Sequence, residues 1–273
     1  MSRLVSFFLA AILLNTWAGD ESYLLAQDKG EWVARQAQDR DTGKDGRSSV
    51  RMRLYDRQGR VRERALTTLT LKGGQGRPVS GDRSLTRFTY PNDINGTGFL
   101  VWENPNGEDE RFLYLPSLGR VRRIAGNETQ DSFVGSDFTY EDIGGREFND
   151  YTYKLIDETS TWTAADGTAH PAYRLESRAK ASSARFPRVI SLIRKDNFVV
   201  VRAEIHNKRD ELQKTFDVKK LDKVSGIWTV LEMAMADSSQ RTRTELFVEK
   251  MEYNVGLKEA DFSRRELERG SGR

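Results

Sequence analysis

Alternating apolar and polar residues recur along most of the chain and indicate strands. In residues 47–54 the apolar side chains of Val50, Met52 and Leu54 share one parity, with arginines between them, which is typical of a strand with one buried face. A turn follows, and a second run over residues 61–71 predicts that the two segments form a hairpin. Similar runs continue toward the C-terminus. We count about eleven strands, with the spacing of an all-β barrel or sandwich.

Residues 84–142 contain three short strand candidates that are rich in aromatic side chains. Residues 99–102 read Phe-Leu-Val-Trp and residues 112–115 read Phe-Leu-Tyr-Leu, and both have the length and residue type of a strand. The gaps after them contain the Pro and Gly of tight turns. This stretch is therefore predicted to be a meander, which needs neighbouring elements to bury its apolar side.

A loop with an unusual composition follows the meander, at residues 126–145. Phe133, Phe138 and Tyr140 stand there among Ser, Thr, Asp and Gly, and three aromatic rings are more than a purely solvated loop needs. Two interpretations are open. The loop packs on the edge of the sheet, or it acts as a movable lid or flap.

Helical spacing of apolar residues predicts a helix over residues 21–40, although Gly30 interrupts the pattern. This helix either faces an ordinary core or covers a β surface. Residues 189–193 and 198–201 are apolar on both parities, so both faces of the sheet should be covered there. We therefore expect a curved sheet that holds a helix in its hollow, with room for an apolar ligand beside it. Residues 258–269 should end the chain as a short charged helix or tail.

The first 18 residues have the pattern of a secretory signal peptide. A short basic start precedes an uncharged apolar run over residues 4–14, and small residues at Thr16 and Ala18 offer a cleavage site. The apolar run is too short to span a bilayer. We expect cleavage near Ala18 and a single domain over residues 19–273. Because the sequence has no cysteine, we expect an exported protein that carries neither an acyl anchor nor a disulfide.

Charge and motif content argue against several classes of function. The formal net charge is +3 with both signs interspersed, whereas nucleic-acid binding requires a clustered basic face. His170 and His206 share no ligand spacing with other donors, and no serine stands in a nucleophile-elbow motif. We therefore expect no catalytic residue, no metal site, no cofactor and no nucleic-acid partner.

Three arginines, Arg120, Arg122 and Arg123, follow the last strand of the meander. In one interpretation they pair across strands with acids such as Glu103 or Glu110, each exposed pair contributing about 0.2–1 kcal/mol. In the other they form a basic rim that meets a headgroup or an acidic partner.

Two runs of sequence carry a family resemblance. They read RFTYPNDINGTGFLVWENPNGEDERFLYLPSLGRVRRI, from residue 87, and DSFVGSDFTYEDI, from residue 131. With the Tyr-Leu-Pro turn at 114–116 and the Gly-Ser-Asp-Phe element at 135–138, the mature chain resembles the outer-membrane lipoprotein-sorting proteins, periplasmic relatives of the carriers LolA and LolB. The resemblance implies a half-open antiparallel β-barrel with helices covering its concave face and a hydrophobic cavity for acyl chains. It also implies a periplasmic location and a link with inner-membrane transporters of the resistance-nodulation-division (RND) class.

The leading hypothesis is accordingly a non-enzymatic carrier of lipid or lipoprotein acyl chains. The alternatives are an accessory module that docks on a transporter without carrying a ligand, and an enzyme acting on envelope lipid or glycan. Strand parity predicts which side chains form the wall of the cavity, and it selects Met52, Leu54, Phe88, Tyr90, Phe99, Val101, Phe112, Tyr114, Ile190, Leu192, Met233 and Met235.

Overall fold

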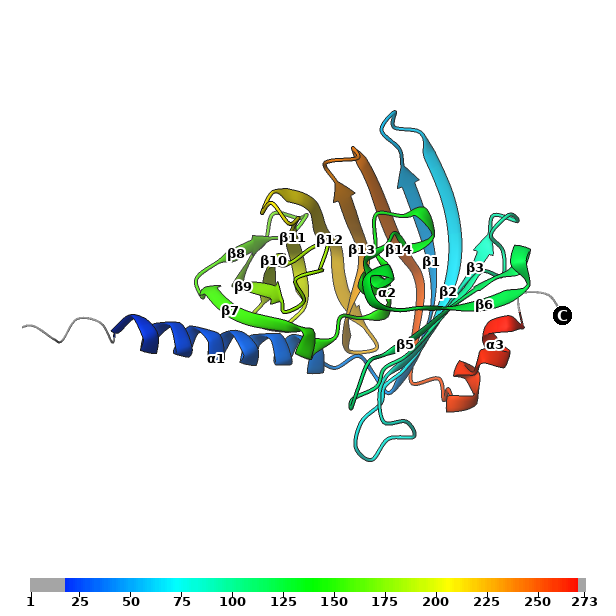
Figure 1. The fold of residues 1–273 in the computed structure, drawn as a ribbon, viewed down its shortest axis with the longest axis horizontal. Coiled ribbons are helices and arrows are strands. Elements are labelled where there is room, and N and C mark those ends of the chain that lie inside the picture. The colour runs from blue at the N-terminus through cyan, green and yellow to red at the C-terminus, as the bar shows by residue number, and fades with distance from the viewer. Residues whose placement is uncertain (1–17, 270–273) are drawn as a thin grey trace, which may run out of the picture.

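The computed structural model describes residues 18–269 (Figure 1). The predicted signal peptide lies outside these described residues except for its last position. Within the described part of the chain, no helix is long and apolar enough to cross a membrane.

The described residues form one antiparallel sheet of fourteen strands with few helices. Thirteen strands follow the order β6-β5-β4-β3-β2-β1-β14-β13-β12-β11-β10-β9-β7, and β8 pairs with β9 alone. The strands are β1 Asp45–Tyr55, β2 Val61–Leu71, β3 Arg83–Tyr90, β4 Gly98–Trp102, β5 Glu110–Leu115, β6 Arg120–Ile124, β7 Tyr151–Asp157, β8 Thr161–Thr163, β9 Ala169–Ala179, β10 Arg188–Arg194, β11 Val200–His206, β12 Leu212–Val224, β13 Ile227–Asp237 and β14 Thr242–Tyr253. The helices are α1 Ala18–Asp39, α2 Tyr140–Gly144 and α3 Arg264–Glu268, with 3-10 turns η1 Pro116–Leu118, η2 Gly126–Gln130, η3 Phe133–Gly135, η4 Phe148–Asp150 and η5 Glu259–Phe262.

The sheet curves without closing, which confirms the predicted half-open barrel. Its edge strands β6 and β7 are consecutive in the sequence. The segment that joins them, residues 125–150, must therefore cross from one edge of the sheet to the other. We call residues 126–145 the flap, the sheet face beneath it the inner face, and the opposite face the outer face. Figure 1 shows α2 of the flap lying in front of the central strands.

The strand count differs from the prediction of about eleven for identifiable reasons. The segment 151–162 forms two strands, β7 and β8, although its sequence alone is compatible with one strand. Asp157 causes the break, because its carboxylate accepts hydrogen bonds from the Thr159 amide (2.7 Å) and the Ser160 hydroxyl (2.6 Å), which closes a turn. The short edge strand β6 is an addition to the predicted set.

Helix α1 packs against β7 and β9 and covers one end of the inner face. Val33 and Ala34 of α1 are buried against Leu155 and Leu175. Gly30 permits this contact, since a Cβ at this position would lie 2.7 Å from the backbone nitrogen of Leu155. The helix predicted over residues 21–40 is thus confirmed, and its glycine serves the close approach of helix and strand.

Two other segments pack on the outer face, the C-terminal segment and β8. The C-terminal segment, predicted as a charged helix or tail, places the fully buried side chains of Phe262 and Leu267 on the outer face of β3 to β5. The indole nitrogen of Trp102 donates to the carbonyl oxygen of Phe262 at 2.7 Å. At the other end of the sheet, Trp162 of β8 packs over Val199 and neighbouring apolar residues. Both faces of the sheet are therefore covered, as the two-sided apolar strands predicted.

Candidate functional site

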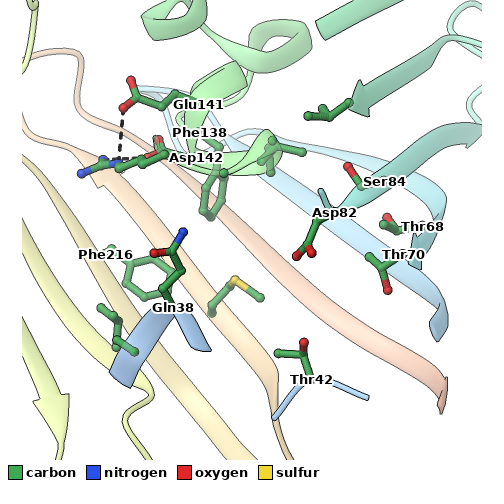
Figure 2. Close-up of a pocket in the computed structure, with 18 of the residues that line it drawn as sticks. Gln38, Thr42, Thr68, Thr70, Asp82, Ser84, Phe138, Glu141, Asp142 and Phe216 are labelled. Atoms are coloured by element: carbon green, nitrogen blue, oxygen red, sulfur yellow. Dashed lines mark hydrogen bonds and ion pairs between the residues drawn. The ribbon is translucent and has the colours of Figure 1, made fainter. Parts of the chain in front are cut away.

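A cavity of about 840 Å³ lies between the inner face, the C-terminal half of α1 and the flap (Figure 2). Its volume falls in the range of pockets that hold small organic ligands. Strands β1, β2 and β9 to β14 contribute most of the apolar wall. The apolar lining residues are Ala34, Ala37, Val50, Met52, Leu66, Leu71, Val101, Phe133, Phe138, Ile143, Phe148, Leu175, Val189, Ile193, Val200, Ala203, Ile205, Phe216, Met233, Met235, Leu246 and Val248.

The flap forms the roof of the cavity with its aromatic side chains. Phe133 is fully buried, and its ring centroid lies 5.7 Å from that of Phe88, 5.6 Å from that of Phe99 and 5.6 Å from that of Tyr140. Phe138 is also buried and lines the cavity. The flap is thus packed across the sheet in this structure, and its movement stays a prediction.

Asp137 attaches the flap to the central strands β12 and β14. Its carboxylate accepts hydrogen bonds from the hydroxyl groups of Thr242 and Thr244, the latter at 2.7 Å. Its amide donates to the Thr244 hydroxyl oxygen at 3.0 Å, and its carbonyl oxygen accepts from Lys214 Nζ at 2.6 Å. Asp137, Lys214 and Thr244 are all buried. Burial lowers the pKa of Lys214.

A second attachment holds the flap to β2. The Arg64 guanidinium donates a hydrogen bond to the carbonyl oxygen of Val134. Val134 adopts a left-handed backbone conformation with φ of 48°, which is unfavourable for a β-branched residue. The flap is therefore held at both β2 and β14, and the strain at Val134 is tolerated because these contacts fix the backbone around it.

One end of the cavity is polar. Thr68 and Thr70 of β2 lie opposite Thr86 and Ser84 of β3, and all four side chains line the cavity. The hydroxyl groups of Thr68 and Thr86 lie 3.2 Å apart. Asp82 lies beside this group, as Figure 2 shows.

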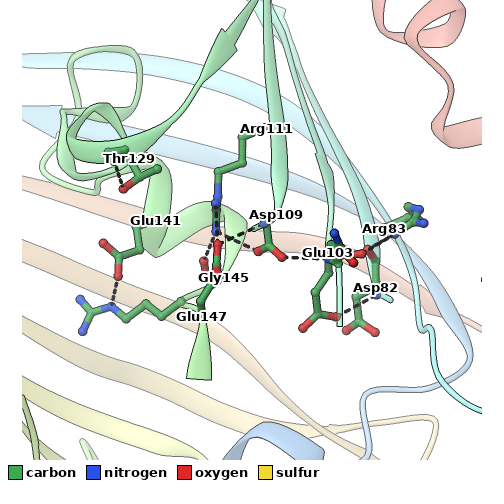
Figure 3. Close-up of polar contacts among 12 residues, drawn as sticks. Asp82, Arg83, Glu103, Asp109, Arg111, Thr129, Glu141, Gly145 and Glu147 are labelled. Carbon is green, nitrogen blue, oxygen red and sulfur yellow. Dashed lines mark hydrogen bonds and ion pairs between the residues drawn. The ribbon is translucent and has the colours of Figure 1, made fainter. Parts of the chain in front are cut away.

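A buried ionic cluster borders the polar end (Figure 3). Arg111 donates to Asp109 (2.9 Å), to Glu147 (3.4 Å) and to the carbonyl oxygen of Gly145 (3.1 Å). The Asp109 carboxylate also accepts from the Asn104 amide at 3.0 Å. Burial nevertheless raises the pKa of Asp109 to about 6, since desolvation outweighs these stabilising contacts. The cluster ties β5 to the segment that follows the flap.

The predicted wall residues fall into three groups. Four of them line the cavity: Met52, Val101, Met233 and Met235. Three are buried in the inner-face core next to the cavity without lining it: Leu54, Phe88 and Phe99. Five do not reach it: Tyr90, Phe112, Tyr114, Ile190 and Leu192.

The five residues that were wrongly assigned to the cavity wall have physical explanations. A β-bulge between β2 and β3 shifts the parity of Tyr90, which is 55% exposed. In β5, Phe112 and Tyr114 belong to the outer-face cluster with Phe262 and Leu267, while Leu113 packs on the inner face. In β10 the wall is formed by residues of the parity opposite to Ile190 and Leu192, and Leu192 packs in the cluster around Trp162. Both faces of these strands are apolar, so alternation gave no basis for choosing one.

Several cavity residues were missed by sequence reasoning. Val189 and Ile193 of β10, Ala203 and Ile205 of β11 and Phe216 of β12 line the wall. Alternation in residues 203–205 was the available signal, but it does not say which face is concave. The flap residues Phe133 and Phe138 line the cavity, whereas Tyr140 packs beside it.

The three arginines of the predicted basic rim lie on the edge strand β6 and are exposed. Arg122 pairs with Glu128 of the flap at 3.2 Å, rather than with Glu103 or Glu110. Among the described residues, no group of three His, Cys, Asp or Glu side chains could hold a metal ion.

Comparisons with known proteins place the chain in a family. A family model described as "Uncharacterized protein" matches residues 80–269. A crystal structure of a DUF1329 family protein from Desulfovibrio piger is 30% identical over 89% of this chain and 99% of that one, with a TM-score of 0.78. A putative outer membrane lipoprotein-sorting protein domain from Vibrio parahaemolyticus is 26% identical over the same shares of the two chains, also with a TM-score of 0.78.

The fold extends to more distant structures. A LolA superfamily protein from Nitrosomonas europaea is 17% identical over 86% of this chain and 97% of that one, with a TM-score of 0.64. No curated protein matches the chain. The resemblance to the LolA-like outer-membrane lipoprotein-sorting proteins is thus confirmed, and the chain belongs to the DUF1329 family.

Proposed function

We propose that the protein is a periplasmic carrier that binds the acyl chains of a lipid or lipoprotein in the cavity beneath the flap. The observation that supports this most directly is the 840 Å³ cavity with a mainly apolar wall. A soluble domain fills such a space with side chains unless a ligand uses it. Burying about twelve methylene groups contributes about 10 kcal/mol before the cost of ordering the ligand.

The character of the wall supports a ligand of variable shape. Met52, Met233 and Met235 line neighbouring parts of the cavity. Methionine side chains are flexible and polarizable, so they adapt to chains that differ in length or unsaturation. A carrier that accepts and releases its ligand without covalent chemistry needs this adaptability more than it needs a catalytic group.

The family context supports the location and the partner. The relative from Vibrio parahaemolyticus is described as a putative outer membrane lipoprotein-sorting protein domain, and the expected signal peptide would export this chain to the periplasm. We further propose that the carrier exchanges its ligand with an RND-type transporter of the inner membrane. The proposal for this partner stems from the family resemblance.

The test is to identify what the exported protein carries. The mature protein is isolated from the periplasm, and its bound lipid is measured by native mass spectrometry and by solvent extraction. Ala203→Phe fills the cavity from the middle of β11, and Ala65→Phe adds the same bulk on the outer face of β2 as a control. We expect lipid on the wild type and on the control, and its loss from A203F.

Absence of lipid from all three proteins would refute the carrier function. Co-purification of a cross-linked inner-membrane transporter with both A203F and the wild type would then favour the docking module. If A203F retained as much lipid as the control, the ligand would lie outside the cavity described here.

A further inference from the structure

The polar end of the cavity has a chemistry that selects among amphiphiles. The hydroxyl groups there form a row that starts at Thr86, which is 4% exposed, and ends at Thr70, which is exposed. Thr70 lies directly opposite Ser84, and Figure 2 shows both side chains together on one wall. The row thus leads from the buried interior to solvent, as expected for the place where a ligand's polar head would leave an apolar cavity.

Two of these hydroxyl groups are available to a ligand. Thr68 and Thr86 bond to each other. Thr70 and Ser84, in contrast, have no side-chain hydrogen-bond partner among the described residues. A hydroxyl group both donates and accepts, so this pair can bind another hydroxyl group or an ester carbonyl.

The charges around the cavity disfavour an anionic head. Six carboxylates line it, from Asp45, Asp82, Glu103, Asp109, Glu141 and Asp142, against three bases. Each base already has partners among the described residues. Lys72 pairs with Asp82 and Arg146 with Asp142, both at 2.9 Å, and Arg83 donates to the carbonyl oxygens of Gly81, Asp82 and Glu103.

An incoming phosphate or carboxylate would therefore meet an excess of negative charge, and the three basic side chains that could bind it are already paired within the domain. It would have to displace an existing ion pair or lose hydration without compensation. A neutral head that bonds to Thr70 and Ser84 carries neither cost.

From this arrangement we infer that the ligand is an amphiphile with an uncharged, hydroxyl-bearing head, such as a monoacylglycerol, and that Thr70 and Ser84 bind that head. This inference rests on the proposed carrier function. It narrows the class of ligand by excluding fatty acids and anionic phospholipids as preferred cargo.

The test compares heads on one acyl chain. The delipidated mature protein is loaded with the neutral fluorescent probe N-phenylnaphthylamine, which is then displaced at pH 8 by a monoacylglycerol, by the fatty acid of the same chain, or by the corresponding alkylammonium. We expect the monoacylglycerol to bind at least tenfold more tightly than the fatty acid. We expect the same relative to the ammonium, because the carboxylates that line the cavity already accept hydrogen bonds or ion pairs from groups of the domain. In the double variant T70V/S84A the affinity for the monoacylglycerol should fall about tenfold, because two hydrogen bonds are lost, while the affinity for the probe is unchanged.

Thr67→Val, on the outer face of the same strand, is the matched control and should leave all affinities unchanged. Equal binding of the monoacylglycerol and the fatty acid would overturn the inference and leave the carrier function standing. Preferred binding of the ammonium would overturn it in favour of a cationic head. If neither the probe nor any amphiphile bound, the carrier function itself would fail, and the inference with it.

Discussion

Replacing Asp137 with alanine tests whether the flap can open as a unit. Asp137 is the buried residue through which the flap contacts β12 and β14. The D137A variant removes the carboxylate that accepts from Thr242 and Thr244 but retains the backbone contacts to Lys214 and Thr244. The aromatic roof on Phe133 is unchanged, so the flap should still close.

The expected magnitude follows from the two lost hydrogen bonds. A hydrogen bond to a charged acceptor contributes about 1.5–3 kcal/mol, and water can partly replace it at the rim of the sheet. Taking the lower value for each bond, the free energy of flap opening should fall by about 3 kcal/mol. This corresponds to an open population about 100-fold larger.

Native-state hydrogen exchange measures this opening locally. The amide of residue 137 donates to the Thr244 hydroxyl oxygen at 3.0 Å, and this hydrogen bond joins the flap to β14, so exchange at this amide reports on the closed flap. We expect its exchange to accelerate about 100-fold in D137A while the amides of β13 and β14 keep their rates. The control is D131A, which removes an exposed carboxylate from the same flap and should leave the rates unchanged.

Two results would refute the reasoning. If exchange rose equally in the flap and the central strands, Asp137 would stabilise the whole domain and the flap would not open separately. If exchange in the flap were unchanged, the aromatic roof alone would hold it closed.

Three further predictions concern the rest of the domain. As the pH falls from 7.5 to 5, the free energy of unfolding of the wild type should rise by about 1.4 kcal/mol relative to that of D109N. The reason is that the pKa of Asp109 is about 6 in the folded state and 3.8 in the unfolded state, so the uptake of a proton favours folding. The same difference in unfolding free energy between wild type and D109N at both pH values, measured by chemical denaturation, would contradict this. Gly30→Ala should lower the melting temperature despite the better helix propensity of alanine, since its Cβ would clash with the backbone of β7, and a higher melting temperature would show that α1 is not held there. Phe262→Ala should cost about 3–5 kcal/mol of unfolding free energy in chemical denaturation, whereas a loss below about 1 kcal/mol would mean that the C-terminal segment is not docked.

The sequence predicted the architecture well because strand alternation is a local property. Met52 lines the cavity, and Arg51 and Arg53 on the opposite parity mark the other face of β1 as polar. Met233 and Met235 of β13 also line the cavity. Alternation failed in β5 and β10, where the outer face is covered as well and both parities are apolar. The cover over β5 comes from residues 259–268, and nothing in β5 itself indicates that this distant segment packs there.

The contacts that attach the flap to the sheet could not be predicted from the sequence, for a related reason. Asp137 and Thr242 are 105 positions apart, and neither belongs to a recognisable motif. Their contact depends on the flap crossing the sheet, which follows only when β6 and β7 are known to be its two edges. Likewise, the polar end of the cavity arises from the register that sets Thr70 opposite Ser84, and register is a property of the paired strands.

The connection between the edge strands bears on how a ligand would enter. Because the flap joins β6 to β7, it is the covalent link across the opening of the sheet. Besides the exposed pair of Glu128 with Arg122 of the edge strand β6, it is hydrogen-bonded to strands away from the edges, through Arg64 of β2 and Thr242 and Thr244 of β14. In the opening that we propose, the loss of these contacts frees the middle of the flap while its ends stay fixed in the sheet. The proposed opening then requires no strand pair to separate, and its cost is the cost of the flap contacts alone. The half-open sheet would remain rigid throughout, which is what the proposed binding wall, formed by so many strands, requires.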